Sequence, residues 1–305
     1  MLRRRAVGGR QLPGVNERVS ERDRQPGVAL VIGSGSVKCA ASIGLMKCFH
    51  EEQIPIERVV GCSGGSIYAA AIALGHDSAT VQALTTQLWT REVTGQSDRR
   101  ALLSMVFPRL LGFDGWFGLK KDALVNERLK TAFGEATFAD CKIPLHITAT
   151  DFRTGEQVTI SEGRIRDAVR ASIAIPFAFA PWEIDGRMLV DGFLSDPLPV
   201  GVAIREGAHV IVAMGFESPN QERITSGGRF AFQLSSIMTN NLLRASFAFH
   251  GLAHHSEVIA VIPQFSERIR LFDTAKIPLL VREGEAAMRE QLPYLRRLLA
   301  ASPSA

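Results

Sequence analysis

Apolar and β-branched residues form short runs that alternate with segments of helical spacing along most of the chain. Val28–Ile32 stops at a glycine, and Val59 and Val60 lead into a second glycine, so both runs are typical of buried strands. Residues 37–52 between them have the spacing of a helix. This part of the chain therefore predicts a βαβ unit with a glycine-rich loop after each strand.

The alternation continues toward the C-terminus. Further strands are expected at 145–150, 157–160, 182–184, 187–190, 209–215 and 257–262. Further helices are expected at 66–74, 79–89, 120–133, 165–171, 230–255 and 279–299. Asp185-Gly186 between two of the strands is a type I′ turn signal. The order of elements predicts an α/β protein with a mostly parallel central sheet flanked by helices.

Residues 77–136 interrupt this pattern, because the strand signal disappears there and an apolar, aromatic stretch lies at 102–117. We interpret the segment as a helical cap or insertion. One interpretation is a lid that lies on a lipid surface, with Arg109, Lys120 and Lys121 beside its apolar face. The other, which is favoured, is an insertion that packs its apolar side on the sheet, because such stripes are usually core.

Gly61-Cys62-Ser63-Gly64-Gly65 fits G-x-S-x-G between a predicted strand and a predicted helix. In a nucleophile elbow, a tight strand-to-helix turn exposes the serine hydroxyl, and small residues such as Gly61 and Gly65 let the chain pass. The serine also needs a base beside it to act as a nucleophile. An ordinary glycine-rich turn is the alternative, but the flanking strand and helix favour the elbow, with Ser63 as nucleophile.

The first glycine-rich loop consists of Gly33, Ser34, Gly35, Ser36, Val37 and Lys38. It is similar to G-x-G-x-x-G, but Lys38 occupies the third glycine position and no acidic residue follows at the place of a ribose ligand, which disfavours dinucleotide binding. Parallel strands would bring this loop beside Ser63, where backbone N–H groups can stabilise an oxyanion. We therefore predict that these six residues form an oxyanion hole, in which Lys38 fixes the loop or meets a phosphate.

Together with Asp191-Gly192-Phe193, these motifs resemble those of the bacterial patatin-like phospholipases. The likeness continues through 143–155 and 170–176 and covers roughly 28–216. The resemblance implies a three-layer α/β fold and a serine acyl hydrolase that acts on (lyso)phospholipids or related acyl esters. It also implies a catalytic dyad of Ser63 and Asp191, with Gly192 beside the aspartate.

Two residues depart from the family pattern. Cys39 stands where the loop normally has glycine, and its side chain would be strained if the backbone there required a positive φ. Phe193 stands where the aspartate motif has a small residue and would narrow the acyl site.

Asp151 ends a predicted strand, so a supporting role at the site and a turn-capping role both stay open. Asp196 is a rival to Asp191 and ranks below it.

The net charge of +4 arises in the first 25 residues, which hold seven arginines and three acidic residues; the rest has 28 basic and 28 acidic residues. A neutral body disfavours nucleic-acid binding. Residues 1–26 are interpreted as a disordered basic tail and residues 27–305 as a single hydrolase domain. The tail has no apolar core of a secretory signal, and no apolar run is long enough to span a bilayer. A cytoplasmic protein is therefore expected, with contact of the tail with anionic lipid and a transit peptide as open alternatives.

The cysteines lack the spacing of a metal site, so free thiols are expected; they are Cys39, Cys48, Cys62 and Cys141. No cofactor and no metal are expected, because the nucleophile, base and oxyanion donors are all protein groups.

A second candidate function is an esterase with a triad of Ser63, Asp191 and either His254 or His255, which occur in α/β-hydrolase order. A third is a catalytically impaired scaffold, disabled at Cys39, that binds acyl chains or a partner.

Overall fold

The central strands of one sheet carry the two predicted glycine-rich loops at their carboxyl ends. The computed structural model describes residues 27–88, 116, 118, 122–217, 224–225, 227–253, 256–267, 269–270 and 273–301. The strands are β1 (Val28–Ile32), β2 (Ile56–Cys62), β3 (Leu145–Asp151), β4 (Gln157–Ile160), β5 (Trp182–Ile184), β6 (Arg187–Asp191), β7 (Val210–Met214) and β8 (Glu257–Val261). They form one eight-stranded sheet in the order β5-β6-β3-β2-β1-β7-β8, with β4 paired to β3 beside this path.

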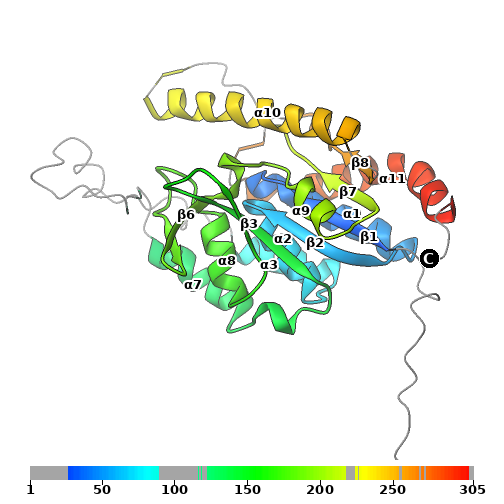
Figure 1. The fold of residues 1–305 in the computed structure, drawn as a ribbon, viewed down its shortest axis with the longest axis horizontal. Helices are drawn as coiled ribbons and strands as arrows, with labels where there is room; N and C mark the ends of the chain where they lie inside the picture. The colour runs from blue at the N-terminus through cyan, green and yellow to red at the C-terminus, as the bar shows by residue number, and fades with distance from the viewer. Residues whose placement is uncertain are drawn as a thin grey trace, which may run out of the picture.

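Helices cover both faces of this sheet (Figure 1). The helices are α1 (Ala41–Glu51), α2 (Gly64–Ala73), α3 (Ser78–Leu88), α7 (Asp122–Phe133), α8 (Ile165–Ser172), α9 (Val200–Arg205), α10 (Gly227–Ala253) and α11 (Ile277–Ala301). Strand β1 is buried throughout, and its residues alternate between two apolar clusters. Leu30 and Ile32 pack with α1, α2, α8 and α11, whereas Ala29 and Val31 pack with α9 and Leu243 of α10. The predicted α/β fold with a mostly parallel sheet between helices is confirmed.

Most predicted elements occur, with boundaries that shift by a few residues. The predicted helix over 37–52 begins as a 3₁₀ turn at Ser36–Ala40 and continues as α1. Asp185 and Gly186 both have positive φ angles, 50° and 74°, as a type I′ turn requires. The short helix α9 was not predicted. Among the helices of the described residues, none is both long and apolar enough to span a lipid bilayer.

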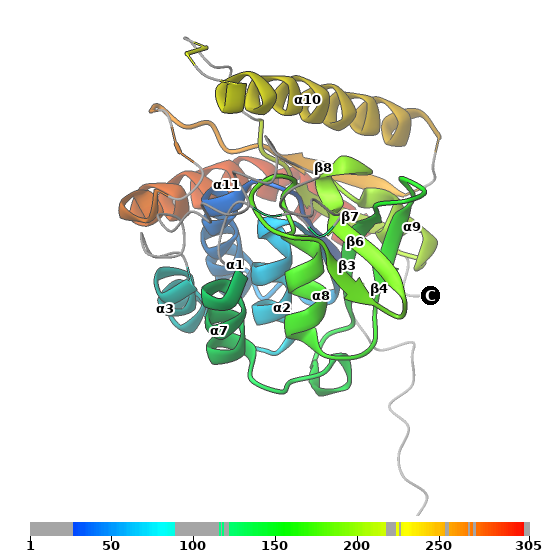
Figure 2. The same cartoon turned by 90° about the vertical axis from the view of Figure 1, so that its left-hand side faces the viewer.

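The described part of the predicted cap packs on the core. Helix α3 buries Val81 and Leu88, and helix α7 buries Leu129 and Phe133, in the same apolar cluster as α2. Figure 2 shows α3 and α7 beside α1, α2 and α8. These two helices therefore pack on the core, and the interpretation of the whole segment 77–136 as a lid or as a packed insertion stays a prediction. The apolar stretch 102–117, apart from position 116, and the basic tail 1–26 lie outside the described residues.

Candidate active site

Strand β3 brings the ends of β2 and β6 together. Its residue Thr148 pairs with Cys62 of β2 on one side and Thr159 of β4 on the other. The next residue, Ala149, again pairs with β4, but its second partner is Asp191 of β6. Strand β2 therefore pairs with one side of β3 as far as Thr148, and β6 pairs with that same side from Ala149 onward. Strand β6 runs antiparallel to β3. The residue after β2 and the last residue of β6 consequently meet, and these are Ser63 and Asp191.

Ser63 occupies a strained turn between β2 and α2. Its φ and ψ angles are 52° and −130°, a combination that costs energy for a residue with a Cβ and that occurs mainly at functional sites. The backbone N–H of Ser63 donates a 2.8 Å hydrogen bond to Ser172 Oγ, and the Ser63 carbonyl accepts a 2.6 Å hydrogen bond from Ser66 Oγ. The turn is thus held from both sides, with α2 beginning at the next residue.

Small residues allow the elbow and the first loop to touch. A Cβ on Gly64 would lie 2.8 Å from the backbone atoms of Ser36, and one on Gly65 would lie 2.3 Å from the Ile32 carbonyl. A Cβ on Gly61 would lie 2.6 Å from Ser66 Cα. All three distances are too short for a real side chain, so the predicted elbow glycines are required by packing. The contact also places the N-terminus of α2, with its partial positive charge, beside the loop.

Asp191 is fully buried and its carboxylate is hydrogen-bonded on both oxygens. Ser63 Oγ donates to Asp191 Oδ2 at 2.7 Å, and the Phe193 N–H donates to Oδ1 at 3.1 Å. Burial raises the pKa of Asp191 to about 7, while these two hydrogen bonds act in the opposite direction. A carboxylate with a pKa near neutrality is basic enough to accept the proton of a serine hydroxyl.

The backbone of the first loop is only partly available to an oxyanion. The Gly33 N–H donates to the Met214 carbonyl at 2.9 Å and the Ser34 N–H donates to the Pro197 carbonyl at 2.8 Å. The Lys38 N–H donates to the Gly35 carbonyl at 3.1 Å. These three amides hold the shape of the loop, so the predicted role as oxyanion donors is wrong for them. The amides of Gly35 and Val37 remain candidates in this loop.

The side chains of Lys38 and Cys39 also hold this loop. Lys38 Nζ donates a 2.6 Å hydrogen bond to the Glu217 carbonyl, and burial lowers the pKa of Lys38 to about 8. Cys39 Sγ donates to the Gly33 carbonyl at 3.4 Å, and burial raises the pKa of this thiol. The expected strain at Cys39 is not found, because the residue lies in a 3₁₀ turn and the positive φ of 52° belongs to Ser36.

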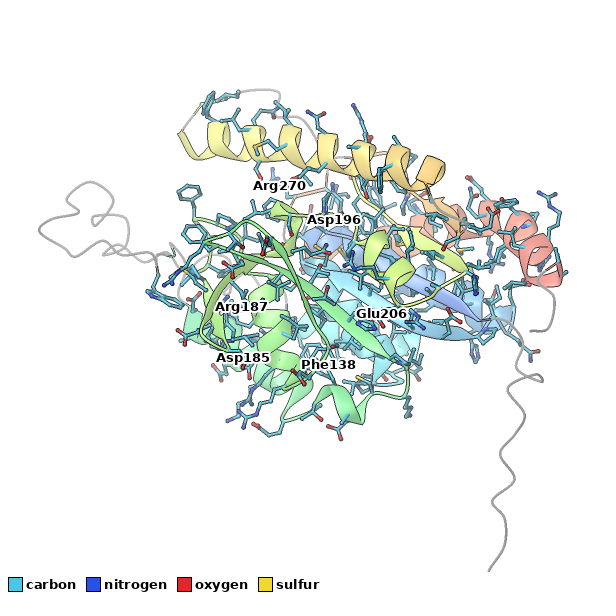
Figure 3. The ribbon with its side chains drawn as sticks, viewed as in Figure 1. Phe138, Asp185, Arg187, Asp196, Glu206 and Arg270 are labelled. Carbon is cyan, nitrogen blue, oxygen red and sulfur yellow. The ribbon has the colours of Figure 1, made fainter. Side chains whose placement is uncertain are left out.

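The remaining predicted carboxylates have structural partners. Asp151 Oδ1 accepts from the N–H groups of Arg153 and Thr154 at 2.8 and 3.2 Å, so Asp151 caps the turn after β3. Asp196, labelled in Figure 3, accepts from the Leu198 N–H at 3.0 Å.

The neighbours of Asp191 fit the site closely. A Cβ on Gly192 would lie 2.5 Å from the Thr148 carbonyl, so this position tolerates only glycine. Phe193 is half-buried and contributes its N–H to the Asp191 carboxylate.

Ser172, the last residue of α8, is a site residue that the sequence pattern did not identify. Its hydroxyl is fully buried, accepts from the Ser63 N–H and donates to the Thr148 carbonyl at 2.7 Å. Two residues earlier, buried Arg170 bonds to Asn126 Oδ1 and forms a 3.0 Å ion pair with Asp122 of α7. A hydroxyl at the end of a buried helix, within the stretch 170–176 that carries the family likeness, was the only sequence signal.

His254 and His255 lie outside the described residues. Among the residues described, no group of three or more His, Cys, Asp or Glu side chains is placed to hold a metal ion.

Comparisons with known proteins give a family model and several relatives that this chain matches. A family model described as patatin-like phospholipase matches residues 30–204. An uncharacterized NTE family protein of Mycobacterium tuberculosis is 29% identical over 189 residues, which are 62% of this chain and 49% of that protein. Neuropathy target esterase sws of Drosophila melanogaster is 27% identical over 203 residues, 66% of this chain and 14% of that protein. This chain therefore spans about half the length of the mycobacterial relative.

A crystal structure of VipD from Legionella pneumophila is similar in fold, with a TM-score of 0.50 and 15% sequence identity. The match covers 88% of this chain and 67% of that chain. At this identity the likeness concerns the fold alone.

Proposed function

Because the chain belongs to the patatin-like phospholipase family, we propose that it hydrolyses carboxylic esters of lipids with Ser63 as nucleophile and Asp191 as base. The family supports lipid acyl hydrolysis as the general class of activity. The observation that carries the finer proposal is the 2.7 Å hydrogen bond from Ser63 Oγ to a fully buried Asp191 carboxylate. His254 and His255, the histidines of the alternative triad, lie outside the described residues, so the dyad and the triad are separated by the variants given below.

In the first half of the reaction, Asp191 accepts the proton of Ser63 as Oγ attacks the ester carbonyl carbon. The carbonyl oxygen becomes an oxyanion, which the N–H groups of Gly35, Val37 and the N-terminus of α2 at Gly64 would stabilise. The bond to the leaving alkoxide then breaks, and protonated Asp191 gives its proton to the alcohol product. The acyl group stays on Ser63 as an ester.

In the second half, Asp191 accepts a proton from a water molecule that attacks the acyl-Ser63 carbonyl. The second tetrahedral intermediate collapses, Ser63 regains a proton from Asp191, and the carboxylic acid leaves. One water is consumed for each ester cleaved. The substrate is proposed to be a phospholipid, a lysophospholipid or a related acyl ester.

The test is hydrolysis of soluble short-chain esters and of a phospholipid panel by the parent, Ser63→Ala and Asp191→Asn. Both variants are expected to lose at least about 1,000-fold in kcat, because each removes a group on which the covalent step depends. Asp151→Asn is the matched control, since it changes a nearby carboxylate that only caps a turn, and its activity is expected to stay close to the parent's.

The double variant His254→Ala/His255→Ala separates the dyad from the triad. Retained activity supports the dyad, and activity lost to the level of Ser63→Ala overturns it in favour of the triad. Absence of Ser63-dependent turnover on every ester would instead favour the binding scaffold.

A further inference from the structure

Helix α10 exposes large apolar side chains on the side that faces away from the sheet. Phe230, Leu234, Ile237, Met238 and Leu242 have exposed fractions between 37% and 64%. Figures 1 and 2 both show α10 along the outside of the molecule, with no other labelled element on its outer side. We call these five residues the outer stripe of α10.

The outer stripe has the periodicity of one helix face. Its members are spaced at i, i+4, i+7, i+8 and i+12, which places them on one side of an α-helix. The opposite side contains Ser236, Thr239 and Leu243, which are buried. Two hydroxyl residues therefore face the protein while five large apolar residues face outward. An exposed apolar patch of this kind marks an interaction surface.

The helix is coupled to the loop beside the proposed nucleophile. The Glu217 carboxylate lies 3.4 Å from Arg244 of α10, and the Glu217 carbonyl accepts the hydrogen bond from Lys38 Nζ. Leu243 of α10 packs toward Gly215, and the ring of Phe216 packs against Gly35 of the loop. The stretch from Gly215 to Glu217 therefore lies between α10 and the proposed oxyanion donors.

The charges of α10 indicate which partner its outer stripe fits. Residues 227–253 contain no aspartate or glutamate, and their charged residues are Arg229 and Arg244. The Arg244 side chain is 68% exposed. Arg244 pairs with the exposed Glu217 carboxylate beside the helix, but the helix itself combines apolar side chains with arginine and no acidic residue, which is complementary to a bilayer that contains anionic lipid.

We propose that the outer stripe of α10 docks the protein on an anionic lipid bilayer, next to the site at which lipid esters would be cleaved. The purpose of this docking rests on the proposed function, since a bilayer holds the substrate of a lipid hydrolase. The docking itself depends on the apolar and basic surface of α10 alone. Binding and turnover can therefore be measured separately.

Binding is tested by co-sedimentation of the full chain, carrying Ser63→Ala, with vesicles of phosphatidylcholine alone or mixed with phosphatidylglycerol. The Ser63→Ala background prevents turnover from changing the vesicles. We expect stronger binding to the mixed vesicles. The additional double substitution Leu234→Ser/Met238→Ser is expected to lower the partition coefficient by at least about tenfold, because two large apolar side chains no longer enter the lipid.

Phe152→Ser is the matched control, because Phe152 is also an exposed aromatic residue, at 55%, but lies in the turn after β3. Its vesicle binding is expected to equal that of the Ser63→Ala parent. Equal binding of the parent and the Leu234→Ser/Met238→Ser variant would overturn the docking proposal. Sedimentation of the free protein is the second arm: a dimer that the double substitution disperses, without any vesicle binding, would show that the stripe is an interface between copies and would also overturn it.

Turnover is then compared in chains that retain Ser63. The double substitution is expected to leave hydrolysis of a soluble short-chain ester within about twofold of the parent, as is usual for surface changes. Hydrolysis of a lipid ester in mixed vesicles is expected to fall with the binding. Vesicle binding without turnover of either substrate would contradict the proposed function while supporting the docking of α10. A vesicle reaction that the double substitution leaves unchanged would contradict the docking.

Discussion

Helix α2 packs mostly small residues against its neighbours, whereas helix α10 exposes large apolar residues. Every residue of α2 is buried, and the helix begins with glycines so close to the neighbouring loop that no Cβ fits. Helix α10 is more than twice as long and turns large apolar residues outward. Close packing of small residues fixes atoms where chemistry requires set distances. Exposed large residues contribute little within the monomer and become useful only when another surface covers them.

Among the changes that test this comparison of helices, the largest effect on kcat is expected from Gly64→Ala, which tests the close packing directly. The new Cβ would lie 2.8 Å from the Ser36 backbone and push the loop and the elbow apart. We expect a loss of about 100-fold in kcat for a soluble ester, since misplacement by a fraction of an ångström removes oxyanion stabilisation. Gly207→Ala is the control: its φ of 83° makes alanine strained, but nothing lies within 4 Å of the Cβ. A Gly64→Ala enzyme as active as this control would contradict the packing argument.

The second prediction concerns pH and the burial of Asp191. Because its pKa is raised to about 7, kcat/KM is expected to fall about tenfold per pH unit below 7 and to level off above it. A pH profile recorded with a pH-independent assay checks this. A flat profile between pH 5 and 8 would rule out Asp191 as the titrating base.

The same shift predicts the pH dependence of stability. A carboxyl group whose pKa is raised on folding stabilises the fold fully below its unfolded pKa, and this contribution is lost as the pH rises through 7. Asp191→Asn, which cannot ionise, is therefore expected to gain stability relative to the parent between pH 5 and pH 8, as measured by urea unfolding.

Ser172→Ala is expected to have an intermediate effect on kcat. It leaves the buried Ser63 N–H and Thr148 carbonyl without their partner, which costs about 1–3 kcal/mol of stability per unsatisfied group. The strained turn at Ser63 is then held on one side only, so kcat is expected to fall about tenfold with little change in KM. Thr85→Val removes another buried hydroxyl, which donates to the Val81 carbonyl of α3, and should leave kcat unchanged. Equal kcat values for the two variants would show that Ser172 does not position the nucleophile.

The smallest effect is expected from Arg244→Gln, a substitution on the outer side of the molecule, and it concerns the free energy of unfolding. Arg244 and Glu217 are both exposed, at 68% and 54%, so their ion pair should change stability by less than about 1 kcal/mol. Urea unfolding at low and high salt measures this. A large loss of stability would mean that α10 is held to the body by this pair rather than by Leu243.

Local patterns were sufficient to predict many of the elements that form the site. The strand before each glycine-rich loop, the G-x-S-x-G turn and the type I′ hairpin depend on neighbouring residues, whose backbone preferences are local. The roles of the loop amides could not be predicted in the same way. The Gly33 N–H is not available to an oxyanion because it donates to the Met214 carbonyl, which belongs to a strand that lies far along the chain. The role of Ser172 could not be predicted either, because its hydrogen-bond partners Ser63 and Thr148 lie far from it in sequence.

By itself, the sequence determined the α/β class, the position of the elbow and the two side chains proposed for the dyad. How Ser63 and Asp191 meet depends on the fold: β6 runs antiparallel to β3, so its last residue, Asp191, pairs with β3 next to the point where β2 ends. The fold also buries Asp191, which raises its pKa, and it places the outer stripe of α10 on the side that faces away from the sheet. Hydrophobic spacing identifies a helix face, but which side of that helix meets the sheet depends on contacts between residues distant in sequence.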